Sequence, residues 1–273
     1  MVKKISTVML GLGLLLILTA CGNVKMQADQ VDSWQKIKAS KKVVIGLDDS
    51  FVPMGFRQKN GQLVGYDIDL AKAAMKKLHL KADFQTIDWS MKETELRNGT
   101  IDMIWNGYSQ TKERQEKVAF SKTYLINEQI LVTKKKHIRH LSQMNHKIVG
   151  LQSGSSGFAS FNQYPQLLKQ QTASSVQYDN FNNAFLDLDA KRIDGIVIDS
   201  VYASYIIAHK NNPEAYLQLK IGYPDEKFAV GLRKGDKTLR NKLNQALTEL
   251  KKDGTIAKLK QKWFGTVKIT DKN

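Results

Sequence analysis

The stretch TIDMI at Thr100–Ile104 returns in similar form as RIDGI at Arg192–Ile196. Each copy follows a segment with helical periodicity, and each continues into a polar loop. Short apolar strands that alternate with helices are typical of parallel sheets covered by helices. Because the pattern occurs twice, it predicts two α/β lobes of similar build.

The segments around these two stretches continue the same alternation. Strands are expected near residues 43–47, 84–87, 101–106, 147–151, 193–198 and 228–232, and helices near residues 68–78, 181–190, 200–209, 236–252 and 255–263. Asn60-Gly61 predicts the turn of a hairpin, and Asn98-Gly99 predicts the end of a short helix. The chain has only 4 prolines and no long linker, so the lobes are expected to be in intimate contact.

The N-terminus has the features of an export signal. Lys3 and Lys4 precede an apolar run at residues 8–18, which is too short for a comfortable membrane span. The run ends at Leu18-Thr19-Ala20-Cys21, which resembles a bacterial lipobox. We therefore expect a lipoprotein signal peptide at residues 1–20, lipidation of Cys21, and a polar tether at residues 21–28. The alternative is an ordinary signal peptide followed by an incidental cysteine.

Charge and cysteine usage exclude several function classes. The net charge is +16, and removal of residues 1–20 would lower it to +14, because only two lysines are lost. The lysines are scattered without interleaved aromatic residues, so a solvated surface near an anionic envelope is favoured over nucleic-acid binding. Cys21 is the single cysteine, which excludes an internal disulfide and a cysteine-based metal cage. We predict no metal and no cofactor.

Common enzyme motifs are missing from the sequence. There is no Gly-x-Ser-x-Gly elbow, because Gly154-Ser155-Ser156-Gly157 has different spacing, and there is no Walker A loop. The five histidines form no metal-binding pair on a helix. These absences favour a protein that is not an enzyme.

Six motifs follow one another along the sequence: Gly46–Met54, Gly65–Ala71, Ile101–Gly107, Thr111–Arg114, Gly150–Ser156 and Asp194–Asp199. They resemble the motifs of bacterial solute-binding protein family 3, the polar amino-acid type. The resemblance covers nearly the whole mature chain, with the motifs in the family's order.

The resemblance implies a periplasmic-binding-protein-like fold, in which two α/β lobes are joined by two crossover strands. Lobe 1 would hold residues 29–125 and 227–267, lobe 2 would hold residues 126–226, and residues 268–273 would form a tail. The ligand would lie in the cleft between the lobes. The implied function is the extracytoplasmic, membrane-anchored binding component of an amino-acid ABC importer, which works as a monomer with a membrane permease.

The basic part of the implied ligand site would hold the carboxylate of an amino acid. Arg114 offers a planar fork of donors at the start of a helix capped by Thr111. Ser155 and Ser156 would add backbone N–H groups from the other lobe. The alternatives are a surface arginine for Arg114, and simple helix capping for the two serines.

The acidic part would hold the ammonium group. Asp199 ends a predicted strand, although it also precedes a helix that it could cap. The backbone of Asn106 and Gly107 and the hydroxyl of Ser109 would complete this part. Asn106-Gly107 stand where several relatives carry Ser-Ser.

Three further residues would contact the ligand side chain. Phe51 and Trp89 match the family positions that sandwich it, and Asp48 would reach its far end, where a carboxylate favours a basic group or a hydrogen-bond donor. The large ring of Trp89 suits a flat polar side chain such as glutamine or half of cystine, and a basic side chain is also possible. Two alternatives remain open: a dehydratase-like enzyme on the same fold, which needs a Glu or His in the cleft, and a sensor or adhesin.

Overall fold

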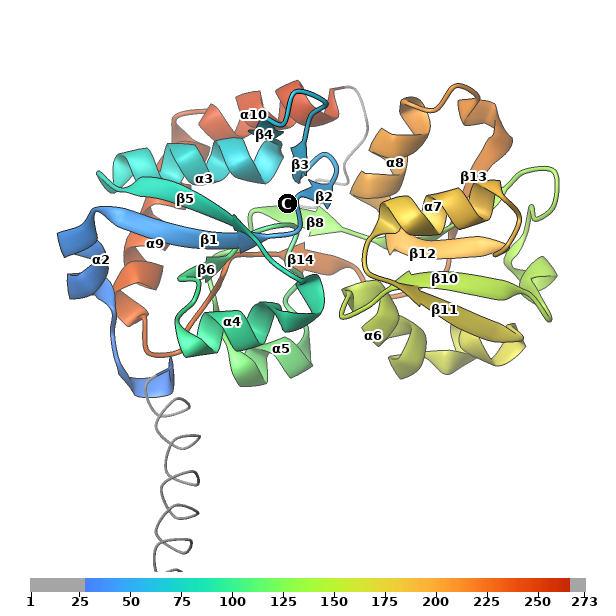
Figure 1. Ribbon diagram of the computed structural model, residues 1–273, viewed down its shortest axis with the longest axis horizontal. Helices are drawn as coiled ribbons and strands as arrows, with labels where there is room; N and C mark the ends of the chain where they lie inside the picture. The colour runs from blue at the N-terminus through green and yellow to red at the C-terminus, as the bar shows by residue number, and fades with distance from the viewer. Residues whose placement is uncertain (1–27, 266–273) are drawn as a thin grey trace, which may run out of the picture.

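Two five-stranded sheets organise the molecule, one in each lobe (Figure 1). The structure is a computed structural model, and it describes residues 28–265. The predicted signal peptide, the lipidation site Cys21, nearly all of the tether and the tail at 268–273 lie outside the described residues. Within residues 28–265, no helix has the length and apolar character needed to span a membrane.

The sheet of lobe 1 has the strand order β5-β1-β6-β15-β7. Its strands are β1 (Lys42–Leu47), β5 (Lys81–Thr86), β6 (Met103–Ile104), β7 (Ala119–Phe120) and β15 (Gly231–Leu232). A small antiparallel sheet, β2 (Ser50–Phe51), β3 (Gly55–Arg57) and β4 (Leu63–Val64), adjoins it. The helices of this lobe are α2 (Trp34–Ser40), α3 (Tyr66–Lys77), α4 (Lys92–Asn98), α5 (Lys112–Lys117), α9 (Lys237–Lys252) and α10 (Thr255–Phe264).

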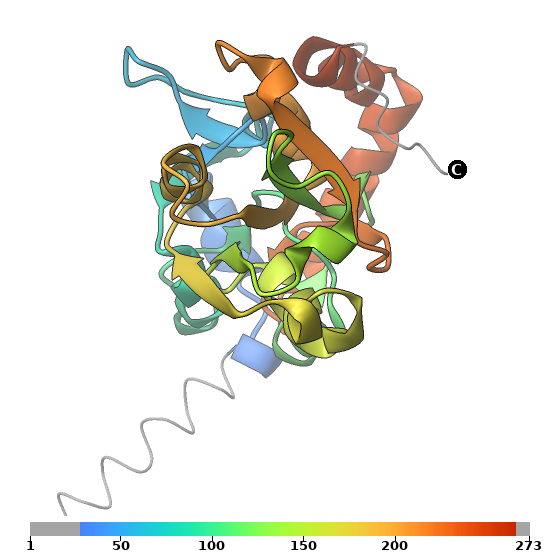
Figure 2. The same cartoon turned by 90° about the vertical axis from the view of Figure 1, so that its right-hand side faces the viewer.

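The sheet of lobe 2 has the strand order β11-β10-β12-β9-β13. Its strands are β9 (Gln129–Lys134), β10 (Ile148–Gln152), β11 (Ser174–Tyr178), β12 (Gly195–Asp199) and β13 (Tyr216–Lys220). The helices of this lobe are α6 (Ser156–Gln163), α7 (Phe181–Asp189) and α8 (Ser200–Ala208). Figure 2 shows this lobe toward the viewer.

Two antiparallel strands link the lobes. The chain leaves lobe 1 through β8 (Leu125–Asn127) and returns through β14 (Glu226–Phe228). The two strands pair with Glu226 opposite Asn127 and Phe228 opposite Leu125, and Figure 1 shows them between the lobes. The predicted fold class, two α/β lobes joined by two crossover strands, is therefore confirmed, whereas the numerical lobe boundaries stay predictions.

The sheets differ from expectation in strand direction. The pattern predicted parallel sheets, but β9 is antiparallel to β12, and β15 is antiparallel to β6. A parallel neighbour requires a crossover connection, usually a helix. The chain enters β9 and β15 directly from the linking strands, so both run antiparallel to their neighbours. The single strand predicted at 228–232 was wrong. In the structure β14 ends at Phe228 and β15 begins at Gly231.

The helical periodicity of residues 68–78 corresponds to α3. Ile68, Ala71, Ala74 and Met75 are fully buried, while the lysines of this helix are exposed. Burial of each large apolar side chain contributes about 1.5–3 kcal/mol relative to exposure. The Asn98-Gly99 signal is also confirmed, because α4 ends at Asn98 and Gly99 takes the left-handed conformation with φ of 84°.

Candidate functional site

A small cavity lies between the lobes and holds about 280 Å³ of space, part of it open to solvent. It is lined by Asp48, Phe51, Trp89, Asn106, Gly107, Arg114, Gln152, Ser155, Ser156 and Asp199. All of these except Gln152 are residues predicted from the sequence. The remaining predicted residue, Ser109, is hydrogen-bonded to Ser156 at 3.2 Å.

Arg114 forms the centre of a basic corner. The Thr111 hydroxyl accepts a hydrogen bond from the Arg114 backbone N–H at 3.2 Å, so the predicted cap of α5 is confirmed. The guanidinium donates to the backbone carbonyl of Ser109 in lobe 1 and to that of Gly154 in lobe 2, both at 3.0 Å. It also lies 4.5 Å from the centre of the Tyr108 ring. Arg114 is 6% exposed, so it is not a surface arginine.

Lys92 adds a second positive charge to this corner. Its side chain is 3% exposed, and its ammonium donates to the carbonyls of Trp89 and Gly154, both at 2.9 Å. The carboxylate of Glu93 lies 3.4 Å from this ammonium. Burial, followed by the nearby charge of Arg114, lowers the pKa of Lys92 to about 7.

The two predicted serines differ in what they contact. The Ser155 hydroxyl caps α6 by accepting from the Phe158 N–H at 3.0 Å, and the Ser155 N–H donates to the carbonyl of Gln152 at 3.2 Å. The capping interpretation therefore describes the Ser155 side chain. The Ser156 hydroxyl instead donates to Glu226 Oε2 at 3.1 Å, and Ser156 is the first residue of α6, where backbone N–H groups lack partners within the helix.

An acidic corner also borders the cavity. In the strand ladders, Asp199 lies opposite Gln129, and Glu226 lies opposite Asn127. Asn127 and Gln129 are two residues apart in an extended segment, so their side chains share one face. Both amides bridge the two carboxylates: they donate to Asp199 Oδ1 at 2.7 and 2.8 Å, and to Glu226 Oε2 at 3.2 and 3.1 Å.

The surroundings of Asp199 disfavour its negative charge. Burial is the main cause that raises its pKa well above the ordinary aspartate value, and the negative charge of Glu226 is the next. Asp199 precedes α8, but its side chain makes no capping hydrogen bond there. The capping alternative is therefore wrong for this residue, and its carboxylate is held toward the cavity by amides.

Asp48 lies at the end of the cavity that the sequence assigned to the ligand side chain. Its carboxylate accepts from the N–H and hydroxyl of Ser50 at 2.9 and 2.6 Å, and from the Gln152 amide of lobe 2 at 2.9 Å. Burial raises its pKa. The Asp48 N–H donates to Asn106 Oδ1 at 3.3 Å, which fixes Asn106 beside it.

Gly107 occupies a position that requires glycine. Its φ is 59°, and a Cβ would lie 2.7 Å from the Phe51 ring. The Gly107 N–H donates to Asp67 Oδ2 at 2.7 Å, and the Tyr124 hydroxyl donates to the same oxygen at 2.8 Å. Asp67, from the family motif at Gly65–Ala71, therefore supports the loop beneath the cavity and lies outside its lining.

The two predicted aromatic walls have different neighbours. Phe51 packs against Phe181 and Tyr202 of lobe 2, with ring centres 6.1 and 5.3 Å away. Trp89 meets the ring of Tyr108 edge-on at 6.0 Å within lobe 1. Phe51 is thus part of an aromatic contact between the lobes as well as a wall of the cavity.

Five residues of this region were missed by sequence reasoning: Lys92, Asn127, Gln129, Gln152 and Glu226. One signal was present in the sequence. Asn127 and Gln129 alternate with Ile126, Glu128 and Ile130, which places two amides on one face of a strand. Glu226 gave no such signal, because only the pairing of β14 with β8 brings it to the site.

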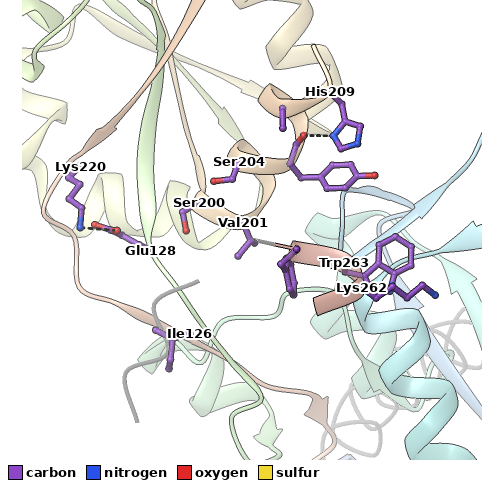
Figure 3. A pocket seen from close by; sticks show the side chains of 13 residues that line it. Ile126, Glu128, Ser200, Val201, Ser204, His209, Lys220, Lys262 and Trp263 are labelled. Atoms are coloured by element: carbon purple, nitrogen blue, oxygen red, sulfur yellow. Dashed lines mark hydrogen bonds and ion pairs between the residues drawn. The ribbon is translucent and has the colours of Figure 1, made fainter. Parts of the chain in front are cut away.

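A larger groove lies between α8 and the end of α10, with about 1330 Å³ of space that includes open solvent (Figure 3). Its charged groups pair with each other or with nearby residues: Glu128 lies 3.4 Å from Lys220, and Lys262 lies 2.7 Å from Asp69. The small cavity instead brings Arg114 and Asp199 together from separate lobes, so we take it as the candidate site. Residues 28–265 contain no cluster of acidic, histidine or cysteine side chains suited to a metal ion.

Comparison with known proteins agrees with this arrangement. A substrate-binding protein of an ABC uptake transporter from Streptococcus pneumoniae, solved with bound histidine, is 48% identical, with a TM-score of 0.85 over 88% of this chain and 99% of its own. An arginine-binding protein 1 of an ABC transporter from Escherichia coli K12 is 29% identical over 83% of this chain and 92% of its own. An L-cystine-binding protein from the same organism is 29% identical over 91% of both chains. The family model for bacterial extracellular solute-binding proteins, family 3, matches residues 43–266, and the chain belongs to this family.

Proposed function

We propose that this protein captures a free L-amino acid outside the cytoplasm and presents it to the permease of an ABC importer. One observation carries the proposal: Arg114 of lobe 1 and Asp199 of lobe 2 line the same small cavity. A zwitterion placed there meets opposite charges from separate lobes, and therefore binds the closed form better than an open one. That difference in affinity is what drives closure.

The orientation of the ligand follows from the charges. Its carboxylate would lie at Arg114 and the N-terminus of α6, where a planar donor fork and free N–H groups are available. Its ammonium would lie at Asp199, with Glu226 close by. These assignments remain predictions for each of the residues that line the cavity.

The side chain of the ligand would then extend toward Asp48. Arg114 would pair with the carboxylate of the ligand and Asp199 with its ammonium group, so neither of these charges would pair with Asp48. A cationic side chain would neutralise it, so we propose arginine or histidine ahead of glutamine and cystine. The relatives that bind histidine and arginine support this order.

The test is calorimetry with arginine, histidine, lysine, glutamine and cystine. We expect arginine or histidine to bind most tightly, with a micromolar or lower Kd. The variant Asp48→Asn should weaken arginine binding by about tenfold or more and change glutamine binding much less, because it removes only the charge that faces the side chain. The matched control is Asp83→Asn, because Asp83 is a partly exposed aspartate of lobe 1 that pairs with Lys42 away from the cavity lining.

Two outcomes would contradict the proposal. If none of these amino acids bound, the importer function itself would be wrong. If arginine bound equally well to wild type and Asp48→Asn, only the assignment of a cationic side chain would fail. Mass spectrometry of the same incubations tests the enzyme alternative, under which the ligand would be converted.

Attachment to the membrane through Cys21 belongs to the same proposal. The lipobox-like sequence before this cysteine supports it, and a diacylglyceryl group would keep the protein beside its permease. The mass of the mature N-terminus tests this point directly.

A further inference from the structure

Lys92 is a buried charge that the ligand site does not use. It is the first residue of α4, it does not line the small cavity, and its side chain is 3% exposed. Burying an ammonium group is costly unless acceptors surround it. Two of its close acceptors, the Trp89 carbonyl and Glu93, belong to lobe 1, but the carbonyl of Gly154 belongs to lobe 2.

Gly154 is shaped for this contact. It has φ of 67°, and a Cβ there would lie 3.1 Å from Ser90 Cα and 3.3 Å from Lys92 Nζ. The chain of lobe 2 therefore approaches lobe 1 more closely at Gly154 than a larger residue would allow. Figure 1 shows α4 and α6 facing each other at this side of the molecule.

The Gly154 carbonyl is shared by two cations. Lys92 Nζ donates to it at 2.9 Å, and Arg114 Nη2 donates to it at 3.0 Å. A carbonyl oxygen accepts two hydrogen bonds, so both lone pairs are occupied. The Arg114 guanidinium has five N–H donors and uses two of them on backbone carbonyls, so the others remain for a ligand carboxylate. Lys92 needs no ligand contact and can hold Gly154 throughout.

The contact between Lys92 and Gly154 affects the ligand site through the residues that follow Gly154 in the chain. Gly154 directly precedes Ser155, which caps α6, and Ser156, which begins it. We propose that Lys92 is a positioning residue for ligand retention, which holds Gly154 against lobe 1 so that the N-terminus of α6 stays over the cavity while Arg114 binds the ligand. This inference rests on the proposed function, because it concerns how the bound amino acid is kept.

The experiment compares Lys92→Met with wild type by stopped-flow kinetics, using the amino acid that binds most tightly in the calorimetric screen. Methionine keeps the length of the side chain and removes its donors. Because the contact forms only when the lobes have closed, we expect the dissociation rate to rise by about tenfold or more, with little change in the association rate. Lys92→Arg, which can still donate to both carbonyls, should restore part of the slow dissociation, which a purely structural role would not predict.

A matched control is Lys112→Met, because Lys112 is an exposed lysine that lines the same surface groove as Lys92, and this variant should release the ligand at the wild-type rate. Small-angle scattering of the ligand-saturated proteins gives a second readout: Lys92→Met should be more extended than wild type, because it lacks a contact that holds the closed lobes together. If both the dissociation rate and the scattering of Lys92→Met matched those of wild type, the inference would be overturned while the proposed function stood. Failure of wild type to bind any amino acid would instead overturn the proposed function.

Discussion

The basic and acidic corners of the cavity are built in opposite ways. At the basic corner, Arg114 and Lys92 are both on lobe 1, and both donate to a backbone carbonyl of lobe 2. At the acidic corner, Asp199 and Glu226 lie on lobe 2 and a linking strand, and the donors that hold them are neutral amides and hydroxyls. In the closed form the two cations therefore have carbonyl partners within the protein, whereas the carboxylates of Asp199 and Glu226 lie close together without a cation from the described residues between them. A ligand ammonium therefore contributes most at the acidic corner.

The largest expected effect is the loss of a corner charge. Asp199→Ala should weaken ligand binding by about 2–5 kcal/mol, because the ligand ammonium would lose the cavity carboxylate and keep only Glu226, which the Asn127 and Gln129 amides also bind. Arg114→Ala should cost a similar or smaller amount, since Lys92 still connects the lobes at Gly154. Calorimetry with the tightest-binding amino acid measures both variants.

The control for both is Arg139→Ala, because Arg139 is exposed on lobe 2 and should leave binding unchanged. If either corner variant bound the ligand as tightly as wild type, that corner would not contact the ligand, and its assigned role would be wrong. If Arg114→Ala lost more binding free energy than Asp199→Ala, the basic corner would contribute more to ligand binding than the acidic corner.

Sequence reasoning reached the two corners to different extents. At the basic corner the family resemblance implied Arg114 and Ser155, and a local signal accompanied each: a threonine cap, or a glycine turn after a strand. Lys92 was missed, since a lysine at a helix start is ordinarily exposed and only the approach of lobe 2 buries it. At the acidic corner Asp199 was identified at the end of a strand. Its partners were missed, because two strand ladders far apart in the sequence bring them together.

The fold was predictable in its alternation and less so in its strand directions. Periodicity located α3, α7 and α9 to within a few residues, because each buries one apolar face. The antiparallel β9 and β15 could not be read from their own residues. Their direction depends on where the chain crosses between the lobes.

The second prediction concerns pH and separates the corners further. Because burial and Glu226 raise the pKa of Asp199, pairing with the ligand ammonium releases a proton at any pH below that raised pKa. Affinity for arginine, whose own charge is constant between about pH 5 and pH 8, should therefore rise with pH. The pKa of Asp199 is higher in the folded protein than in the unfolded chain. The contribution of Asp199 to the free energy of unfolding should therefore fall as the pH rises from the unfolded pKa toward the folded pKa.

Glu226→Gln removes one cause of this shift. The pKa of Asp199 should fall, so the rise in affinity should move to lower pH. Calorimetry in buffers of different ionisation enthalpy counts the released protons. Glu128→Gln is the control, because Glu128 directly follows the other linking strand, β8, and lines the groove in Figure 3. Proton release that was absent from wild type, or unchanged in Glu226→Gln, would show that the two carboxylates are not coupled through the ligand.

The smallest expected effect distinguishes the two serines at the start of α6. Ser155→Ala should lower the free energy of unfolding by about 1 kcal/mol, because it removes the cap on the Phe158 N–H, and should leave ligand affinity nearly unchanged. Ser156→Ala keeps that cap and removes a donor to Glu226, so it should affect binding more than unfolding. Urea denaturation and calorimetry on both variants separate the two effects. If Ser155→Ala weakened binding as much as Ser156→Ala, the Ser155 hydroxyl would have to leave the Phe158 N–H and contact the ligand. The N-terminus of α6 would then bind the ligand through side chains as well as through backbone N–H groups.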